Sequence, residues 1–238
     1  MSAAVPAPEL NSSIPALNSC RQLILVTTPD GETPNATVRL YERPTGETTP
    51  WREVRGPIPA IIGQRGFAWG IGLHGTGAPG EPRKREGDLK SPAGIFRLTS
   101  VFGTANSEQA GFLRLPYRQV TSSTEAIDDP NSKYYNQIVD RSSISNPDWA
   151  SSESMLRVGG RYRFGIMIEH NPGAIAGQGS CIFLHVWDKR YSATAGCTAV
   201  PLNDLTTILH WVDGKANPLI VQLPMSEYLR LKSRWGLP

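Results

Sequence analysis

A histidine and a cysteine close together in one segment, His185 and Cys197, are the residues of this sequence best suited to covalent chemistry. The segment reads CIFLHVWDKRYSATAGCTAVPLNDL over residues 181–205. Its first part, 181–187, predicts a strand in which alternate residues share a face, so His185 lies near the end of one face. We expect a helix to open at Pro201, directly after the turn that carries Cys197.

This arrangement is typical of a cysteine nucleophile with a histidine base. A thiol beside a histidine and near a helix N-terminus has its pKa lowered from about 8.5, which supplies thiolate at neutral pH. Gly196 permits a tight turn, and the N–H groups of Gly196 and Cys197 could stabilise the oxygen of a tetrahedral intermediate. We therefore expect Cys197, His185 and Gly196 to be catalytic. The group that orients His185 stays open between Asp188 and a backbone carbonyl.

The other cysteines fit structural roles better. Cys181 lies about 13 Å from His185 along the predicted strand, too far to be its partner. The chain has 3 cysteines, and a bond between Cys20 and Cys181 would leave Cys197 free in an oxidising compartment. No C-x-x-C spacing occurs, so we expect no metal. The alternative for Cys197 itself is a small buried residue in a tight turn.

The three other histidines are expected to have different roles. His170 follows the predicted strand 161–170 and is either a rival base, a residue that lines the site or an ordinary strand-end histidine. His74 lies in a glycine-rich loop without the Gly-Lys-Ser/Thr of a phosphate loop, and it could line a substrate groove. His210 lies between apolar residues of a predicted helix, where a structural role is expected.

Short β-type runs between turn residues predict the scaffold. With 23 Gly and 20 Pro, the composition favours a mainly β fold. Residues 1–20 are expected to form a flexible arm, residues 21–238 a single domain, and residues 106–154 a polar loop over the surface. The strands are expected at 21–28, 37–43, 58–62, 94–103, 161–170, 181–187 and 218–224, and the helices at 201–214 and 226–235.

The overall composition excludes several classes of partner. The formal charge is +3 and the basic residues are scattered, which argues against nucleic-acid binding. No apolar run of about 18 residues occurs, so we expect no membrane span, and the start MSAAVPAPEL lacks the pattern of a secretory signal. Because the length can support its own core without a partner, we expect a monomer.

Two separate motifs resemble those of one known family. The turn TAGC at 194–197 follows a histidine strand, and the upstream segment EGDLKSPAGIF at 86–96 contains a Ser-Pro-x-Gly turn followed by Phe. Together they resemble the L,D-transpeptidases of the YkuD-like group. The resemblance implies an L,D-transpeptidase-like β-sandwich or mixed sheets with a few short helices, presenting the cysteine at a groove.

The resemblance also implies the reaction and its setting. Cys197 would attack a carbonyl of a peptidoglycan stem peptide, form a thioester and pass the acyl group to an amine, in the periplasm or outside the cell and with no cofactor. Ala195 and Ala199 stand where many members have His and Arg, and the stretch between His185 and Cys197 is short. Another cation, Arg190 or Lys189, would then bind the substrate carboxylate. The residues expected to bind substrate are His74, His170, Arg190 and Thr194.

Two alternatives remain open at this point. An L,D-carboxypeptidase or hydrolase would use the same chemistry with water as the acceptor. A non-catalytic wall-binding module would keep the fold without the reaction, which the absence of the arginine near Cys197 favours.

Overall fold

The apolar run QLILVTT forms β1 (Gln22–Thr28), a strand whose residues are all buried. It pairs in parallel with β13 (Leu219–Pro224) and antiparallel with β2 (Asn35–Glu42). A strand with neighbours on both sides and both faces covered reads as a continuous apolar run, as this one does. The structure is a computed structural model that describes residues 14–44, 49–77, 80–188 and 192–238.

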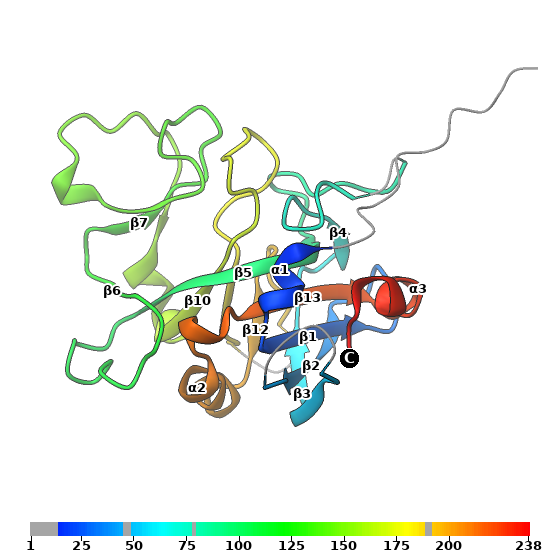
Figure 1. The fold of residues 1–238 in the computed structure, drawn as a ribbon. Helices are drawn as coiled ribbons and strands as arrows, with labels where there is room; N and C mark the ends of the chain where they lie inside the picture. The colour runs from blue at the N-terminus through cyan, green and yellow to red at the C-terminus, as the bar shows by residue number, and fades with distance from the viewer. Residues whose placement is uncertain (1–13, 45–48, 78–79, 189–191) are drawn as a thin grey trace, which may run out of the picture.

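The main sheet closes on itself. Its strands follow the order β10-β11-β12-β3-β2-β1-β13-β5, and β5 pairs back to β10. The described part of the chain thus forms an eight-strand, barrel-like ring, which leaves these strands few free edges (Figure 1). The predicted mainly β fold with a few short helices is confirmed. The remaining bounds are β3 (Arg52–Ile61), β5 (Ser91–Gly103), β10 (Phe164–Ile168), β11 (Phe183–Val186) and β12 (Thr198–Val200).

The long strand β5 connects most of the structure. It pairs with β13 and β10 and carries two short parallel strands, β4 (Phe67–Trp69) and β6 (Tyr117–Gln119). Its first residue is Ser91, so the upstream motif of the sequence enters the main sheet at this strand.

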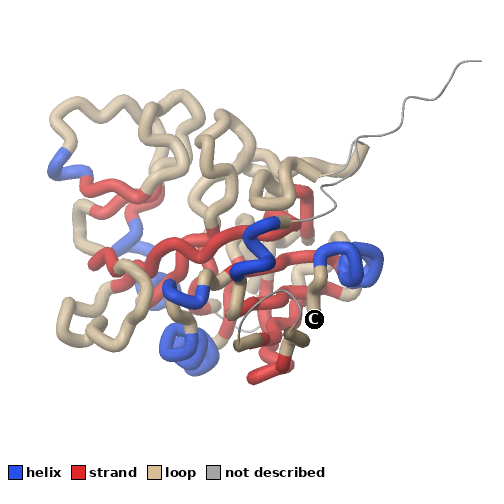
Figure 2. Tube along the Cα trace, in the orientation of Figure 1, coloured by secondary structure: helices blue, strands red, loops and turns tan. Residues whose placement is uncertain are grey.

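Two helices cover the sheet close to where the sequence predicts them. Helix α2 (Leu202–Trp211) buries Leu205, Ile208 and Leu209, and α3 (Met225–Trp235) buries three residues against the same core. Full burial of one leucine or isoleucine contributes about 1.5–3 kcal/mol. Figure 2 shows several long loops at the top of the view, on the opposite side of the strands from α2.

The polar middle of the chain is more regular than expected. Three short strands, β7 (Thr124–Ala126), β8 (Ile138–Asp140) and β9 (Glu153–Ser154), form a separate sheet, at the upper left of Figure 1. A 3-10 turn, η1 (Arg141–Ser143), follows β8. The strand expected at 161–170 begins only at Phe164, because residues up to Tyr162 belong to a 3-10 segment, η2 (Met155–Tyr162).

The expected flexible arm is wrong for residues 14–20. A short helix, α1 (Pro15–Ser19), follows Ile14, and Ile14, Leu17 and Cys20 are buried in the main core. Apolar residues at this spacing share one face of a helical turn, which explains the packing. Residues 1–13 lie outside the described part. A last 3-10 turn, η3 (Gly214–Ala216), leads into β13.

Candidate active site

Two neighbouring parallel strands position the predicted catalytic pair. In the pairing of β11 with β12, His185 lies opposite Ala199 and Leu184 opposite Thr198. Cys197 therefore lies beside Phe183, whose N–H donates to Cys197 Sγ at 3.3 Å. His185 lies two residues after Phe183 on the same face of β11, which places it about 7 Å further along the strand. No hydrogen bond joins the two catalytic candidates in the structure as it stands.

The turn before Cys197 is held by its own side chains. Thr194 Oγ1 donates to the Cys197 carbonyl at 2.6 Å and accepts from the Gly196 N–H at 3.1 Å. A Cβ on Gly196 would lie 3.1 Å from the Lys90 carbonyl oxygen, so the close approach of two chain segments favours glycine. Thr194 therefore holds the turn rather than binding substrate, and the Gly196 N–H is already engaged. The Cys197 N–H has no acceptor among the described residues.

The two motifs of the sequence meet at Ser91. This residue is 0% exposed, and its Oγ donates to the Gly196 carbonyl at 2.6 Å, with the Cys197 carbonyl at 3.2 Å. The same oxygen accepts from the Gly63 N–H at 2.9 Å. No role was predicted for Ser91 itself, although it belongs to the Ser-Pro-x-Gly motif that the sequence singles out. One hydroxyl thus fixes the cysteine turn against the start of β5.

A buried glutamine adds a second connection between the same strands. Gln222 on β13 donates from Nε2 to the Pro92 carbonyl at 3.0 Å, and its Oε1 accepts from Thr198 Oγ1. Gln222 and Thr198 are both fully buried. Buried polar groups that satisfy one another in this way give a segment a single arrangement. Nothing in the spacing of Gln222 indicated this role.

The tautomer of His185 suits a general base. Its ring is buried, and Nδ1 lies 2.7 Å from the Val186 carbonyl oxygen. Since a carbonyl only accepts, Nδ1 carries the proton and Nε2 keeps its lone pair. The orienting group that the sequence left open is therefore a backbone carbonyl and not Asp188. Burial lowers the pKa of His185 to about 4. The Tyr162 ring packs edge-on against the imidazole, with ring centroids 5.4 Å apart.

The expected low pKa of Cys197 is wrong. Burial raises the pKa of this thiol to about 12, opposed mainly by the hydrogen bond from the Phe183 N–H. Strand β12 separates Cys197 from α2, which begins only at Leu202, so the helix N-terminus does not act on the sulfur. Cys197 Sγ lies 3.7 Å from the Cys181 carbonyl oxygen. At neutral pH the pair is therefore a thiol and a neutral imidazole, and any attack by the sulfur would need a proton transfer in the same step.

A cavity of about 280 Å³ opens beside Cys197. Among the described residues that line it, one carries an ammonium group, Lys84, which is 3% exposed and lies 2.6 Å from Asp88 Oδ1. Neither His185 nor Thr194 lines this cavity. The lining residues are Lys84, Glu86, Gly87, Ala126, Asp128, Glu153, Ser180, Cys181, Ile182, Ala195, Gly196 and Cys197.

His74 has a structural role instead of the expected substrate-binding one. Its Nδ1 accepts from the Ile95 N–H at 3.1 Å, and Nε2 lies 3.1 Å from the Gly70 carbonyl. Burial lowers the pKa of His74 to about 4. A Cβ on Gly94, whose φ is +134°, would lie 1.9 Å from His74 Cε1. This contact explains the glycine of the Ser-Pro-x-Gly motif.

His170 is buried in the same layer and does not reach the cavity beside Cys197. Its Nδ1 accepts from the Ile71 N–H at 3.2 Å, and Nε2 lies 2.9 Å from the Gln178 carbonyl. Burial lowers its pKa to about 4. The Phe96 ring packs edge-on against it, with ring centroids 5.9 Å apart. Both ring nitrogens are engaged, so His170 holds a loop in place instead of binding substrate.

The remaining predicted residues are placed as follows. Arg190 and its alternative Lys189 lie outside the described residues. Cys20 is buried in the main core, whereas Cys181 packs against the second, smaller cluster, and both are free thiols. Within the described ranges, no group of acidic, histidine or cysteine side chains could hold a metal ion. No helix in those ranges is long and apolar enough to cross a membrane.

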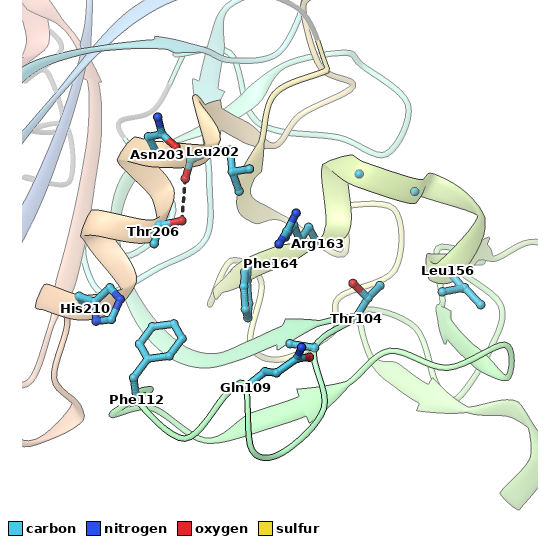
Figure 3. A pocket seen from close by; sticks show the side chains of 13 residues that line it. Thr104, Gln109, Phe112, Leu156, Arg163, Phe164, Leu202, Asn203, Thr206 and His210 are labelled. Carbon is cyan, nitrogen blue, oxygen red and sulfur yellow. Dashed lines mark hydrogen bonds between the residues drawn. The ribbon is translucent and has the colours of Figure 1, made fainter.

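A larger cavity, of about 570 Å³, lies elsewhere, between α2, the loop around Gln109 and η2 (Figure 3). The His210 ring stacks on Phe112 at its edge, with centroids 4.1 Å apart, and Arg163 points toward its centre. His210 is exposed here and is not part of the core. Neither Cys197 nor His185 lines this cavity, so it does not serve the chemistry predicted from the sequence.

Comparison of the chain with protein families, with curated proteins and with solved structures found no match. The fold defines a mainly β protein whose main sheet closes into a ring of eight strands. A cysteine and a histidine lie on one face of two adjacent strands, with a polar cavity at the cysteine.

Proposed function

We propose that this chain is a cysteine acyltransferase of the L,D-transpeptidase type, acting on peptidoglycan stem peptides in the periplasm or outside the cell. Its sheet would then be a variant of the L,D-transpeptidase fold. The observation that carries the proposal is the hydrogen bond from Ser91 to the Gly196 carbonyl, between residues 105 positions apart. Two motifs that resemble the same family thus build one site, with the cysteine at a cavity.

The chemistry follows from the tautomer of His185 and the free N–H of Cys197. Cys197 Sγ attacks the carbonyl carbon of the donor peptide while its proton passes to His185 Nε2. The Cys197 N–H donates to the developing oxyanion. His185 then gives the proton to the departing amine as the tetrahedral intermediate collapses to a thioester. An acceptor amine then attacks this thioester and gives a proton to His185 Nε2, and the C–S bond breaks as that proton returns to the Cys197 sulfur.

The reaction requires Nε2 and Sγ to come within hydrogen-bond reach when substrate binds. Catalytic hydrogen bonds are often long or absent without substrate and tighten in the complex. The raised pKa of Cys197 fits this order of events, because the thiol stays protonated until a carbonyl is in place.

Product analysis tests the proposal. The protein and its Cys197→Ala variant are incubated with purified disaccharide tetrapeptides and a free D-amino acid, and products are identified by mass spectrometry. Cys181→Ala is the matched control, because Cys181 lines the same cavity. We expect dimers or exchanged stems with the wild type and Cys181→Ala but not with Cys197→Ala. Loss of the terminal residue alone would make the protein a carboxypeptidase, and unchanged substrate would contradict the proposal.

A non-catalytic wall-binding module is the second candidate. The observation in its favour is the raised pKa of Cys197 together with the missing hydrogen bond to His185. In that case disaccharide peptides bind the wild type and Cys197→Ala equally, and no product forms with either. Equilibrium binding measured beside the product assay separates the two functions.

A further inference from the structure

We propose that Lys84 is a further catalytic residue, whose ammonium group donates a hydrogen bond to the oxyanion that forms when Cys197 attacks a carbonyl. The inference rests on the proposed function for the attack itself. It adds a cation to a site in which the sequence indicated only Cys197, His185 and Gly196 as catalytic.

Lys84 is a buried charge with an unused donor. It is 3% exposed, and its ammonium group donates to Asp88 Oδ1 at 2.6 Å and to the Arg85 carbonyl at 2.7 Å. An ammonium group has three N–H donors, and the third has no acceptor among the described residues. Because a buried ion pair often adds little to stability, its presence here favours a functional reason.

The direction of this ammonium group is fixed by a carboxylate that is itself held in place. Asp88 Oδ1 also accepts from the Lys90 N–H at 2.9 Å, and Oδ2 accepts from the Arg85 N–H at 2.8 Å. A donor that is fixed before the substrate arrives needs no reorganisation when negative charge develops. This is the condition for electrostatic stabilisation of a transition state.

The Lys84 side chain reaches the turn that carries Cys197. Both residues line the same cavity. A Cβ on Gly196 would lie 3.7 Å from Lys84 Cε, and a Cβ on Gly179 would lie 3.0 Å from Lys84 Cγ. Glycine at these two positions therefore leaves room for the lysine stem to lie against the cysteine turn.

The cysteine turn by itself offers one free N–H to an oxyanion. The Gly196 N–H already donates to Thr194 Oγ1 at 3.1 Å, whereas the Cys197 N–H has no acceptor among the described residues. The Lys84 ammonium group offers a second donor. Because this donor is charged, its hydrogen bond to an anion is the stronger of the two.

The other charged groups among the described residues that line the cavity are carboxylates, those of Glu86, Asp128 and Glu153. They oppose negative charge on the sulfur or on a bound oxygen. Burial is the largest cause of the raised pKa of Cys197, and the charge of Lys84 acts on that pKa in the opposite direction. In this part of the wall, Lys84 is therefore the group that can offset the charge formed during the attack.

An aldehyde adduct tests the inference without turnover. The probe is N-acetylalanine aldehyde, labelled with carbon-13 at the aldehyde carbon. Cys197 Sγ forms a bond to that carbon, the carbonyl double bond opens and the thiol proton passes to the oxygen, which gives a hemithioacetal. The carbon-13 shift followed against pH reports the pKa at which this hydroxyl becomes an oxyanion.

Two substitutions of Lys84 locate the effect. Lys84→Met removes the charge, and the acid dissociation constant of the adduct should then be at least about tenfold smaller than in the wild type. Lys84→Arg keeps the charge and should recover part of this difference. In the product assay, Lys84→Met should lower kcat by about a hundredfold with little change in KM.

Lys90→Met is the matched control. The Lys90 ammonium group also donates to a backbone carbonyl, that of Arg65 at 2.8 Å, yet Lys90 does not line this cavity. Unfolding midpoints check that the variants are folded. Since Lys84→Met leaves Asp88 without its cation, the double variant Lys84→Met/Asp88→Asn removes both charges and replaces the single variant if that one does not fold.

The outcomes separate this inference from the proposed function. An adduct pKa that does not change in Lys84→Met, equal effects of Lys84→Met and Lys90→Met, or no adduct on the folded wild type overturns the inference. If product forms while the adduct pKa is independent of Lys84, the inference alone is contradicted. If the adduct pKa depends on Lys84 and the wild type makes no product, the inference is supported and the acyltransfer on peptidoglycan is contradicted.

Discussion

Ser91 offers the sharpest test of how the site is assembled. Replacement by Ala keeps the Cβ but removes the hydroxyl that accepts from the Gly63 N–H and donates to the Gly196 carbonyl. Because Ser91 is fully buried, the variant leaves a backbone donor and a backbone acceptor without partners. Each such group costs about 1–2 kcal/mol, so Ser91→Ala should lower the free energy of unfolding by about 2–4 kcal/mol.

Urea unfolding followed by tryptophan fluorescence measures this change. The matched control is Ser143→Ala, whose exposed hydroxyl donates to the Asp140 carbonyl at 2.8 Å. We expect a change below about 0.5 kcal/mol for the control. Ser91→Ala should also reduce product formation in folded protein, because the turn that carries Cys197 loses its anchor. A loss of stability no larger than that of the control would refute the assigned role of Ser91.

The remaining predictions concern protons, packing and thiol reactivity. The three buried histidines have a pKa of about 4 in the folded protein, whereas the unfolded chain takes up protons near pH 6.5. The free energy of unfolding should therefore be highest above pH 6.5 and fall toward pH 4, and at pH 5 each histidine should have lowered it by about 2 kcal/mol. Equal urea midpoints at pH 7 and pH 5 would exclude this. Gly94→Ala should abolish folding or lower the melting temperature sharply, because its Cβ would lie 1.9 Å from His74. Gly160→Ala is the control: its Cβ would meet nothing within 4 Å, so the melting temperature should hardly change. Similar melting curves for the two variants would contradict the packing around Gly94. Native Cys197 should react with a disulfide reagent at pH 7.5 at least about a hundredfold more slowly than a free thiol, because its pKa is about 12. Labelling of Cys197 at the rate seen in the unfolded chain would contradict the raised pKa.

Local patterns in the sequence were sufficient for most elements but not for their closure into a ring. The apolar runs at 21–28 and 218–224 became β1 and β13, and both predicted helices formed. The pairing of β10 with β5 joins segments far apart in sequence, which no local period reports. The short helix α1 was missed because its few apolar residues are interrupted by Pro, Ser and Asn.

In the candidate site, too, some features follow from neighbouring residues in the sequence, whereas others depend on contacts that only the fold creates. The proximity of Cys197 and His185 follows from one strand, one turn and a parallel partner, so the sequence could indicate it. The pKa of Cys197 could not be predicted, because it depends on burial and on three strand residues placed before α2. His74 and His170 looked available in the sequence, yet their ring nitrogens are engaged by loops that only the fold brings to them.

The most direct test of the central claim is capture of the acyl-enzyme. The protein is mixed with disaccharide tetrapeptide, quenched in acid and digested, and the peptide containing residue 197 is examined by mass spectrometry. The proposed function predicts a thioester adduct on Cys197, equal in mass to the donor without its terminal residue, in the wild type and in Cys181→Ala. An adduct elsewhere, or none at any time while product accumulates, would contradict Cys197 as the nucleophile.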